Sequence, residues 1–357
     1  MTYDYTMLLT FVSTLFSNLT AGDHAARVKA TAELLQGVLR TQRASLSGMG
    51  RGAAIINPRK SFMSQLKRAY RLMKNEAWDA WEIGAALYRY ATADLTTVVV
   101  SVDWTQVGRF MVLEASLVVE GRGIPFYAIA VLAEELKGRQ TTIELSMWYA
   151  LEAMRRAEQT LYVVVDRGFA KLDWIGASPL YPSLRLLVRL KSHMILTWDT
   201  VSGALREWPL YPGEQVQIER AQLGRKDPEE TGLCLLNLSP NLRTPLYLAC
   251  APEDVAIAYS FYKKRPWVEL QNRDLKTNFM MRILRLFRAD RLERMWTFMG
   301  LAFYVSYCNE AVHDTAFARR MGRRYTDGRK DLSWLSLAGC AELSGQVDVV
   351  FRPLAAQ

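Results

Sequence analysis

The chain has 357 residues, of which 50% are hydrophobic and 11% aromatic, so it can bury a large core and does not have the composition of a disordered protein. Its 45 Lys and Arg against 36 Asp and Glu give a formal charge of +9, which favours a polyanionic partner, nucleic acid first and an anionic membrane second. With only three histidines, and with scattered cysteines that form no CxxC pair, the chain lacks the ligand pattern of a zinc site, and a reducing cytoplasm is the simplest setting.

No segment has the pattern of a membrane anchor or a secretory signal. The first 16 residues, MTYDYTMLLTFVSTLF, include an apolar stretch but have an acidic start and no basic region. The longest apolar zone, residues 95–119, is interrupted by Asp103, Arg109 and Glu114, so it cannot cross a bilayer as a helix. We therefore expect a cytoplasmic protein without membrane contact.

Residues 34–75 contain nine Lys or Arg and no acid. Two helical patterns flank a connection that includes GMGRG at 48–52, which we interpret as a turn. The second pattern, residues 61–75, is apolar on one side and basic on the other, as phosphate contacts require, although such a helix can also serve solubility alone. The basic side chains expected at DNA are Arg51, Arg59, Lys60, Lys67, Arg68 and Arg71.

The pattern changes to strands at about residue 95. Three β-branched or apolar runs precede an amphipathic helix, a second valine-rich strand, a short helix and one more strand, and they occupy residues 96–104, 110–119, 124–133, 143–159, 160–166, 167–176 and 183–192. This order is that of an RNase H-like fold, an α/β sheet of mixed direction with helices on both faces.

Short strands and turns then dominate, and we interpret them as a β-rich insertion before helical character returns. The expected divisions are a helical DNA-binding domain at residues 1–92 and the first part of the RNase H-like core at 93–190. The β-strand insertion follows at 191–250, then a core segment that carries Glu269 at 251–290, and a helical C-terminal region at 291–357.

Asp103 and Asp166 each follow a valine-rich run, VVVSV and LYVVV. An Asp after a strand usually ends it in a turn or caps a helix. If the two strands are parallel neighbours, however, both carboxylates lie at the same edge of the sheet, where functional groups gather. Adjacent carboxylates repel unless a hard cation such as Mg²⁺ neutralises them.

Tyr262, Arg265, Glu269 and Lys276 are spaced so that they fall within an arc of roughly 60° on a continuous helix. A solvated helical face with mixed charge is the simplest explanation. Pro266, however, fits the first turn of a helix and disfavours a helical conformation at its predecessor. The helix can therefore begin at Pro266, which places Tyr262 and Arg265 just before it. Glu269 is the candidate third carboxylate of a two-metal phosphoryl-transfer site.

The spacing Tyr-x2-Arg-x3-Glu-x6-Lys over residues 262–276 resembles the signature of the insertion sequence 4 family of bacterial DDE transposases. VDWT at 102–105 and VDRGF at 165–169 are similar to the family's first and second aspartate motifs. The resemblance implies that two Mg²⁺ ions, with Mn²⁺ as a substitute, bind Asp103, Asp166 and Glu269. The resemblance also implies that Tyr262, Arg265 and Lys276 contact the DNA phosphates near the cleaved end of the transposon.

The resemblance also implies the reaction: nicking at the transposon end, attack of the freed 3′-OH to form a hairpin, hairpin opening and strand transfer. Hairpin formation implies a flipped base that stacks on an aromatic of the insertion. We expect Trp208 in that role, with Trp198 next, although a core position explains either. The family usually has an aromatic where this chain has Pro266, and Trp267 is the candidate substitute.

The implied partners are double-stranded DNA, as terminal inverted repeats and target, and a second copy of the chain in a paired-end complex. In a bacterial cytoplasm such a protein associates with the nucleoid. Residues 293–307 are a candidate pairing surface, although a buried core helix explains them equally well. Two alternative functions are a transposase-derived DNA-binding protein that no longer cuts and an RNase H-like nuclease without strand transfer.

Overall fold

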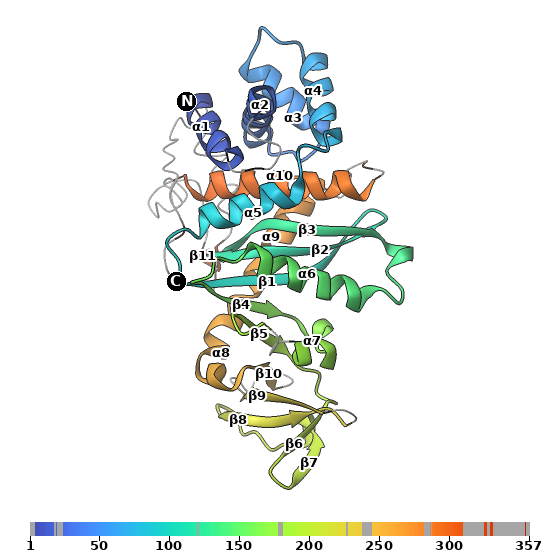
Figure 1. Ribbon diagram of the computed structural model, residues 1–357, viewed down its shortest axis with the longest axis vertical. Coiled ribbons are helices and arrows are strands. Elements are labelled where there is room, and N and C mark those ends of the chain that lie inside the picture. Colours follow the sequence, from blue (N-terminus) through green and yellow to red (C-terminus); the bar gives the residue numbers. More distant parts are fainter. Residues whose placement is uncertain are drawn as a thin grey trace.

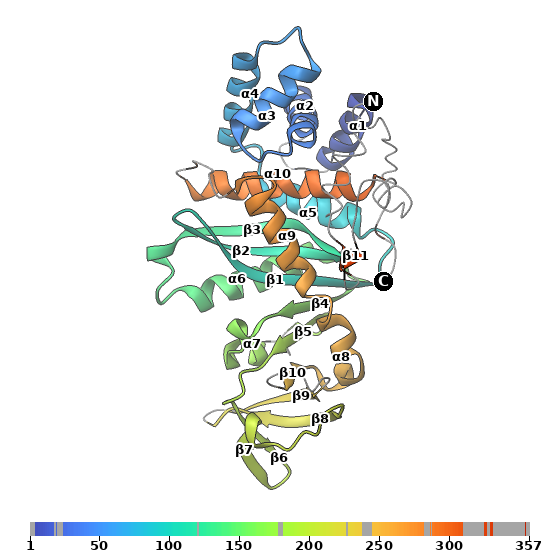
Figure 2. The ribbon, with the colours of Figure 1, turned by 180° about the vertical axis from the view of Figure 1, so that it is seen from behind.

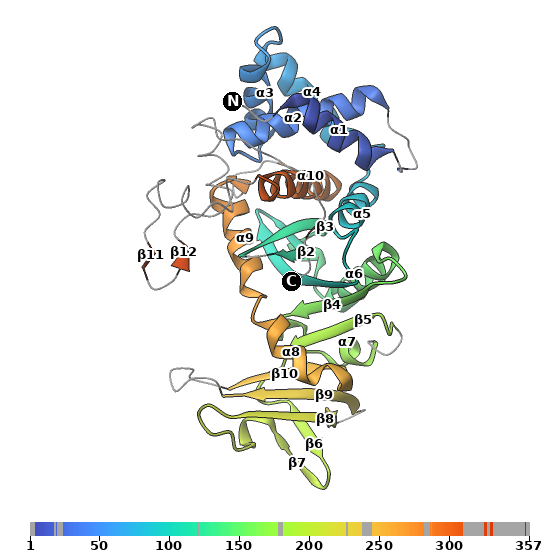
Figure 3. The same cartoon turned by 90° about the vertical axis from the view of Figure 1, so that its left-hand side faces the viewer.

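The computed structural model describes residues 4–17, 19, 24–119, 121–177, 181–225, 228–237, 245–281, 286, 288–309, 325–326, 329–330 and 354 (Figure 1). Within them the protein is a mixed α/β structure built on one ten-stranded sheet. A group of helices lies at one end of the long axis and the last strands of the sheet lie at the other (Figures 1 and 3).

Five helices precede the sheet. Side-chain oxygens of Asp4, Ser45, Ser61 and Asp79 accept backbone N–H groups at four of their N-termini, which satisfies donors that a helix start leaves without partners. The five are α1 (Tyr5–Phe16), α2 (Ala25–Thr41), α3 (Leu46–Ile56), α4 (Phe62–Lys74) and α5 (Ala80–Ala91).

The interpretation of GMGRG as a turn is wrong, because these residues lie inside α3. A Cβ atom on Gly52 would lie 2.0 Å from the carbonyl oxygen of Gly37 in α2, so the two helix backbones touch at this point. Close helix packing therefore accounts for glycine here, and it offsets the low helix propensity of the residue.

The first half of the sheet has the predicted order of elements: three strands, a helix, a strand, a short helix and a strand. The first three strands form an antiparallel meander, and the next two run parallel to the first. These elements are β1 (Thr97–Val107), β2 (Phe110–Val119), β3 (Arg122–Leu132), α6 (Gln140–Met154), β4 (Thr160–Val165), α7 (Leu172–Ala177) and β5 (Leu184–Arg189).

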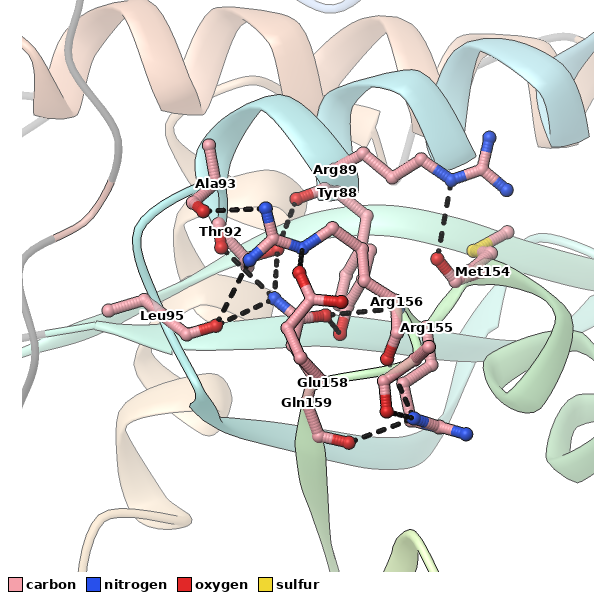
Figure 4. A network of polar contacts seen from close by, with 11 residues as sticks. Tyr88, Arg89, Thr92, Ala93, Leu95, Met154, Arg155, Arg156, Glu158 and Gln159 are labelled. Carbon is pink, nitrogen blue, oxygen red and sulfur yellow. Dashed lines mark hydrogen bonds and ion pairs between the residues drawn. The ribbon is translucent and has the colours of Figure 1, made fainter.

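The helix expected to reach residue 159 ends at Met154. The side chain of Arg155 folds back onto the carbonyl groups of Arg156, Ala157 and Gln159, and the buried amide of Gln159 donates to carbonyl oxygens of the loop that joins α5 to β1 (Figure 4). These contacts satisfy the backbone of a tight loop, which the amphipathic pattern of the sequence does not encode.

The β-rich segment continues the sheet, because β10 (Leu246–Cys250) pairs with β5 in antiparallel fashion. The full order of strands is β3-β2-β1-β4-β5-β10-β9-β8-β6-β7. The remaining strands are β6 (Ile195–Trp198), β7 (Val201–Ala204), β8 (Gln215–Leu223) and β9 (Glu229–Leu236). The predicted division of the chain into separate domains stays a prediction.

Helices cover both faces of the sheet. Figure 1 shows α6 and α7 on the near face, and Figure 2, from behind, shows α8 (Val255–Tyr262) and α9 (Pro266–Thr277) on the other. Helix α10 (Ala289–Tyr307) packs along β3 together with α5, between the sheet and the N-terminal helices.

The candidate pairing surface at 293–307 is wrong, because α10 is a core helix: every side chain from Arg294 to Ser306 is buried within the chain itself. In the expected helical C-terminal region, the described residues beyond α10 include two short strands, β11 (Tyr325–Thr326) and β12 (Arg329–Lys330); most of the rest lies outside the described residues. Among the residues that the structure describes, no helix has the length and hydropathy needed to cross a membrane.

Candidate active site

Asp103 and Asp166 lie side by side at one edge of the sheet, as predicted. Strands β1 and β4 are parallel, and their pairing ends with Val102 opposite Val165, so Asp103, which stays paired with β2, and Asp166, which follows β4, come next at the same level. Asp103 Oδ1 accepts the N–H of Trp104 at 2.9 Å, and Asp166 Oδ1 accepts the N–H of Arg167 at 2.6 Å. Each carboxylate thus keeps its other oxygen, Oδ2, for a further partner.

The guanidinium of Arg265 joins the three predicted acids. Its Nη2 lies 3.1 Å from Asp103 Oδ2 and 3.7 Å from Asp166 Oδ2, and its Nη1 donates to Glu269 Oε1. Arg265 itself is only 8% exposed, whereas the carboxylates keep access to solvent. The structure therefore brings acids from β1, β4 and α9 to one point.

The path of the chain before α9 explains how Arg265 reaches the acids. Helix α9 begins at Pro266, as predicted, and α8 ends at Tyr262. The expectation that Pro266 forces Arg265 out of the helical region is wrong, since Arg265 has φ −53° and ψ −39°. The N–H of Arg265 donates to Tyr262 O at 2.9 Å, so the backbone forms a hydrogen-bonded turn and is not extended. Because the helical conformation continues into α9, the side chains of Arg265 and Glu269, four residues apart, lie on the same side.

The electrostatics of the cluster show carboxylates competing for one cation. Burial raises the pKa of Asp103; Arg265 opposes this shift, and the charges of Asp166 and Glu269 add to it. Burial lowers the pKa of Arg265, but the carboxylates outweigh it, so that pKa is raised overall. The guanidinium of Arg265 is therefore the shared cationic partner of the three acidic side chains.

The two remaining signature residues, Tyr262 and Lys276, lie in different surroundings. Tyr262 is buried beside the acids: burial first, and then the charge of Asp166, raises its pKa to about 12, while Arg189 and Arg265 oppose the shift. Its hydroxyl therefore stays protonated at neutral pH. Lys276 lies in the last turn of α9, half-buried, and its charge acts on the buried Glu114 of β2.

The donor set suits a hard metal ion, but the arrangement as it stands holds the guanidinium. Within the described parts of the chain, no group of three or more His, Cys, Asp or Glu is placed so as to hold a metal ion. Carboxylate oxygens are the ligands that Mg²⁺ takes in proteins, and here they converge on a cation. A metal ion at these acids therefore requires Arg265 to withdraw.

A basic hollow of about 520 Å³ opens next to Asp166, and the sequence reasoning missed it. Its cationic lining comes from Arg167, Arg189 and Lys191, with His193 beside them. A signal for it is present in the sequence, because Arg189 ends β5, which is parallel to β4, and Lys191 and His193 follow at the same carboxyl end, where functional groups gather.

The basic residues expected at DNA separate into two groups on α3, α4 and the loop between them. Lys60 Nζ lies 2.6 Å from Glu33 Oε1, and Arg68 donates to the other oxygen of the same carboxylate, so these two are half-buried and paired. Glu33 immediately precedes the acid-free run, which is why the run alone did not reveal the pairing. The other four are exposed: Arg51, Arg59, Lys67 and Arg71.

The structure places two of the three tryptophans considered for base stacking away from the acid cluster. Trp208 is half-buried and packs on the core, with its ring centroid 6.1 Å from that of Trp198, which is 39% exposed. Both lie near the β6–β7 hairpin at the far end of the sheet (Figure 1). Trp267 is half-buried against the apolar cluster under α8.

Comparison of the chain with protein-family models gives no match, and comparison with curated proteins gives none either. The function is therefore argued from the fold and from the acid cluster.

Proposed function

We propose that the protein is a metal-dependent DNA transposase of the DDE class, which cuts and joins DNA with Asp103, Asp166 and Glu269. The observation that carries the proposal is the convergence of these three acids on Arg265 at the point where the pairing of the parallel strands β1 and β4 ends. The strand order, an antiparallel meander followed by two strands parallel to β1, supports an RNase H-like core.

In this proposal the three carboxylates hold two Mg²⁺ ions, with Mn²⁺ as a substitute. Bound there, the metal supplies charge neutralisation and Lewis acidity for attack on a phosphodiester. Arg265 leaves the carboxylates and binds the phosphate at the cleaved end. Tyr262, which keeps its proton because its pKa is about 12, donates a hydrogen bond to a neighbouring phosphate oxygen.

The basic surfaces provide the DNA contacts. Arg167, Arg189 and Lys191 in the hollow beside Asp166 hold the backbone of the strand next to the cut. The exposed cations of α3 and α4 bind the terminal repeat, as part of a helical DNA-binding region at residues 1–92. The strands between residues 191 and 250 act as the insertion of the RNase H-like core, and two copies of the chain pair two DNA ends.

The test is incubation of the purified protein with Mg²⁺ and a labelled duplex that carries the terminal repeat of its own element, beside the Asp166→Ala variant. Denaturing gels are expected to show nicks that convert to a slow-migrating hairpin, absent in the variant. A target plasmid added to the reaction reports joining. Cleavage without joining supports a nuclease instead, and binding without cleavage of pre-nicked DNA in Mg²⁺ or Mn²⁺ supports a DNA-binding protein.

A further inference from the structure

Glu144 is a fully buried carboxylate with four hydrogen-bond donors. Trp104 Nε1 and Gln140 Nε2 donate to Oε1 at 3.0 and 2.8 Å. Lys171 Nζ and Trp174 Nε1 donate to Oε2 at 2.6 and 3.0 Å. The side chain of Glu144 is 0% exposed, so the carboxylate is held by these donors and not by water. Such an arrangement fixes the direction of every group that takes part.

Three of the four donors belong to the chain segments that carry the proposed metal-binding aspartates. Trp104 follows Asp103 in β1, and side chains alternate across a strand, so the indole reaches α6 on one face while Asp103 meets Arg265 on the other. Lys171 and Trp174 follow Asp166, one just before α7 and one within it. Glu144 thus connects both segments on the face of the sheet that α6 and α7 cover, which is the near face in Figure 1.

The strand ladder by itself does not fix the second segment. Pairing between β1 and β4 ends at Val102 and Val165, and Asp166 begins a 3₁₀ turn, Arg167–Phe169. Beyond that point the chain runs to Lys171 and α7, both of which are held by the Glu144 carboxylate. The orientation of Asp166 relative to Asp103 therefore depends on contacts beyond the ladder, and Glu144 supplies contacts to both sides.

We propose that Glu144 is a positioning residue of the cleavage site, which sets the relative placement of Asp103 and Asp166 by holding Trp104 and the segment from Lys171 to Trp174. The inference rests on the proposed function, because the placement matters only if both aspartates share a metal ion. Groups that orient metal ligands in this way typically change metal affinity or activity by about 10- to 100-fold when they are mutated.

The test is Glu144→Gln. Glutamine keeps the volume, but its amide NH₂ group must face one of the two pairs of donors, so one segment loses its acceptor. Mn²⁺ binding to the DNA-free protein, measured by isothermal titration calorimetry, is expected to weaken about 10-fold or more. On a pre-nicked DNA end, kcat is expected to fall by a similar factor, while the Kd for DNA stays that of the wild type. Glu144→Asp, which keeps the charge, should restore part of both losses.

The matched control is Gln159→Leu. Gln159 is also a buried polar group with several partners, but it lies at the opposite end of β4 from Asp166 (Figure 4). This variant is expected to lower Tm while Mn²⁺ affinity stays unchanged. If Glu144→Gln does not fold, Trp104→Phe and Trp174→Phe each remove a single donor and are expected to weaken Mn²⁺ binding.

The outcomes separate the two proposals. A wild-type protein that neither binds Mn²⁺ nor cleaves DNA overturns the proposed function and this inference with it. A wild-type protein that does both, beside Glu144 variants that lose stability but keep Mn²⁺ affinity and kcat as Gln159→Leu does, overturns this inference alone.

Discussion

Arg265 donates from Nη2 to Asp103 Oδ2 at 3.1 Å, and this contact places a cation from the N-cap position of α9 against the acid of β1. The same guanidinium contacts Asp166 and Glu269. One arginine therefore does in this structure what a divalent cation does in the proposed reaction: it offsets the repulsion among three carboxylates.

Arg265→Ala is expected to make the stability of the protein depend strongly on divalent metal. Without the guanidinium, the acids repel each other, and we expect a cost of roughly 2 kcal/mol, below the 3–5 kcal/mol of a fully buried pair because Glu269 reaches solvent. Mg²⁺ then binds without a competitor, so the rise in Tm on adding Mg²⁺ should be larger in the variant than in the wild type. Cleavage of DNA should be lost, since the phosphate ligand is missing.

Arg185→Ala is the control for this measurement. Arg185 lies near the start of β5, at the opposite end of this strand from Arg189, and pairs with Glu253 away from the acid cluster. Its removal should leave the response to Mg²⁺ unchanged. An equal rise in Tm for the wild type and for Arg265→Ala would contradict competition between Arg265 and the metal.

Glu114→Gln is expected to change how stability depends on pH. Glu114 is opposite Asp103 in the β1–β2 ladder, and its Oε2 accepts from Trp296 Nε1 at 2.9 Å and Gln271 Nε2 at 3.1 Å. Burial first, and then the charge of Asp103, raises its pKa from 4.5 to about 8. Because the folded protein keeps Glu114 protonated, the contribution of this group to stability is full below pH 4.5 and is lost as the pH rises towards 8.

The glutamine variant does not titrate and keeps an oxygen for both donors. The free energy of unfolding of the variant minus that of the wild type should therefore increase with pH across this window, by up to about 1.4 kcal/mol per pH unit. Urea denaturation in metal-free buffer at several pH values measures the difference, in which titrating groups that do not interact with Glu114 cancel. A difference that stays constant with pH would show that Glu114 is ionised in the folded protein.

Asp274→Asn tests the attachment of α9 to the sheet. Arg122 Nε at the start of β3 lies 2.9 Å from Asp274 Oδ2, and both side chains are buried. Removing one charge leaves the other buried, and such a change typically costs about 3–5 kcal/mol. Because α9 also holds Glu269, cleavage should fall with stability. The double variant Arg122→Met with Asp274→Leu should recover part of the unfolding free energy, and single variants no less stable than the double would argue against a buried pair.

The local parts of the site could be predicted from the sequence. Valine-rich runs that end in Asp103 and Asp166, with a helix between them, indicate parallel neighbours, and the ladder confirms the pairing. Pro266 marked the start of α9. These inferences succeed because strand burial and proline geometry act over a few residues.

What the sequence did not reveal depends on contacts between distant segments. Arg265 was assigned to phosphate, whereas the structure shows it among the acids, since the turn after α8 was not foreseen. The pairing of Lys60 and Arg68 with Glu33 crosses from α4 and its preceding loop to α2. A buried carboxylate such as Glu144 appears on an amphipathic helix like any other acid until its donors are brought together by the fold.

Gly52→Ala is expected to destabilise the N-terminal helices while sparing metal binding. The added Cβ would lie 2.0 Å from Gly37 O and 2.6 Å from Gly37 C, both backbone atoms, so α2 and α3 must separate. Overpacking of this kind typically costs about 1–3 kcal/mol, and Tm should fall accordingly.

DNA binding by the Gly52→Ala variant should weaken, because α3 and α4 pack together and carry the exposed cations. Mn²⁺ affinity should persist, because the acids come from β1, the end of β4 and α9, and α10 lies between the sheet and the N-terminal helices (Figure 3). Gly168→Ala, where a Cβ has nothing within 4 Å, is the control for Tm and should match the wild type. Equal Tm values for Gly52→Ala and the wild type would show that α2 and α3 are not in backbone contact in solution.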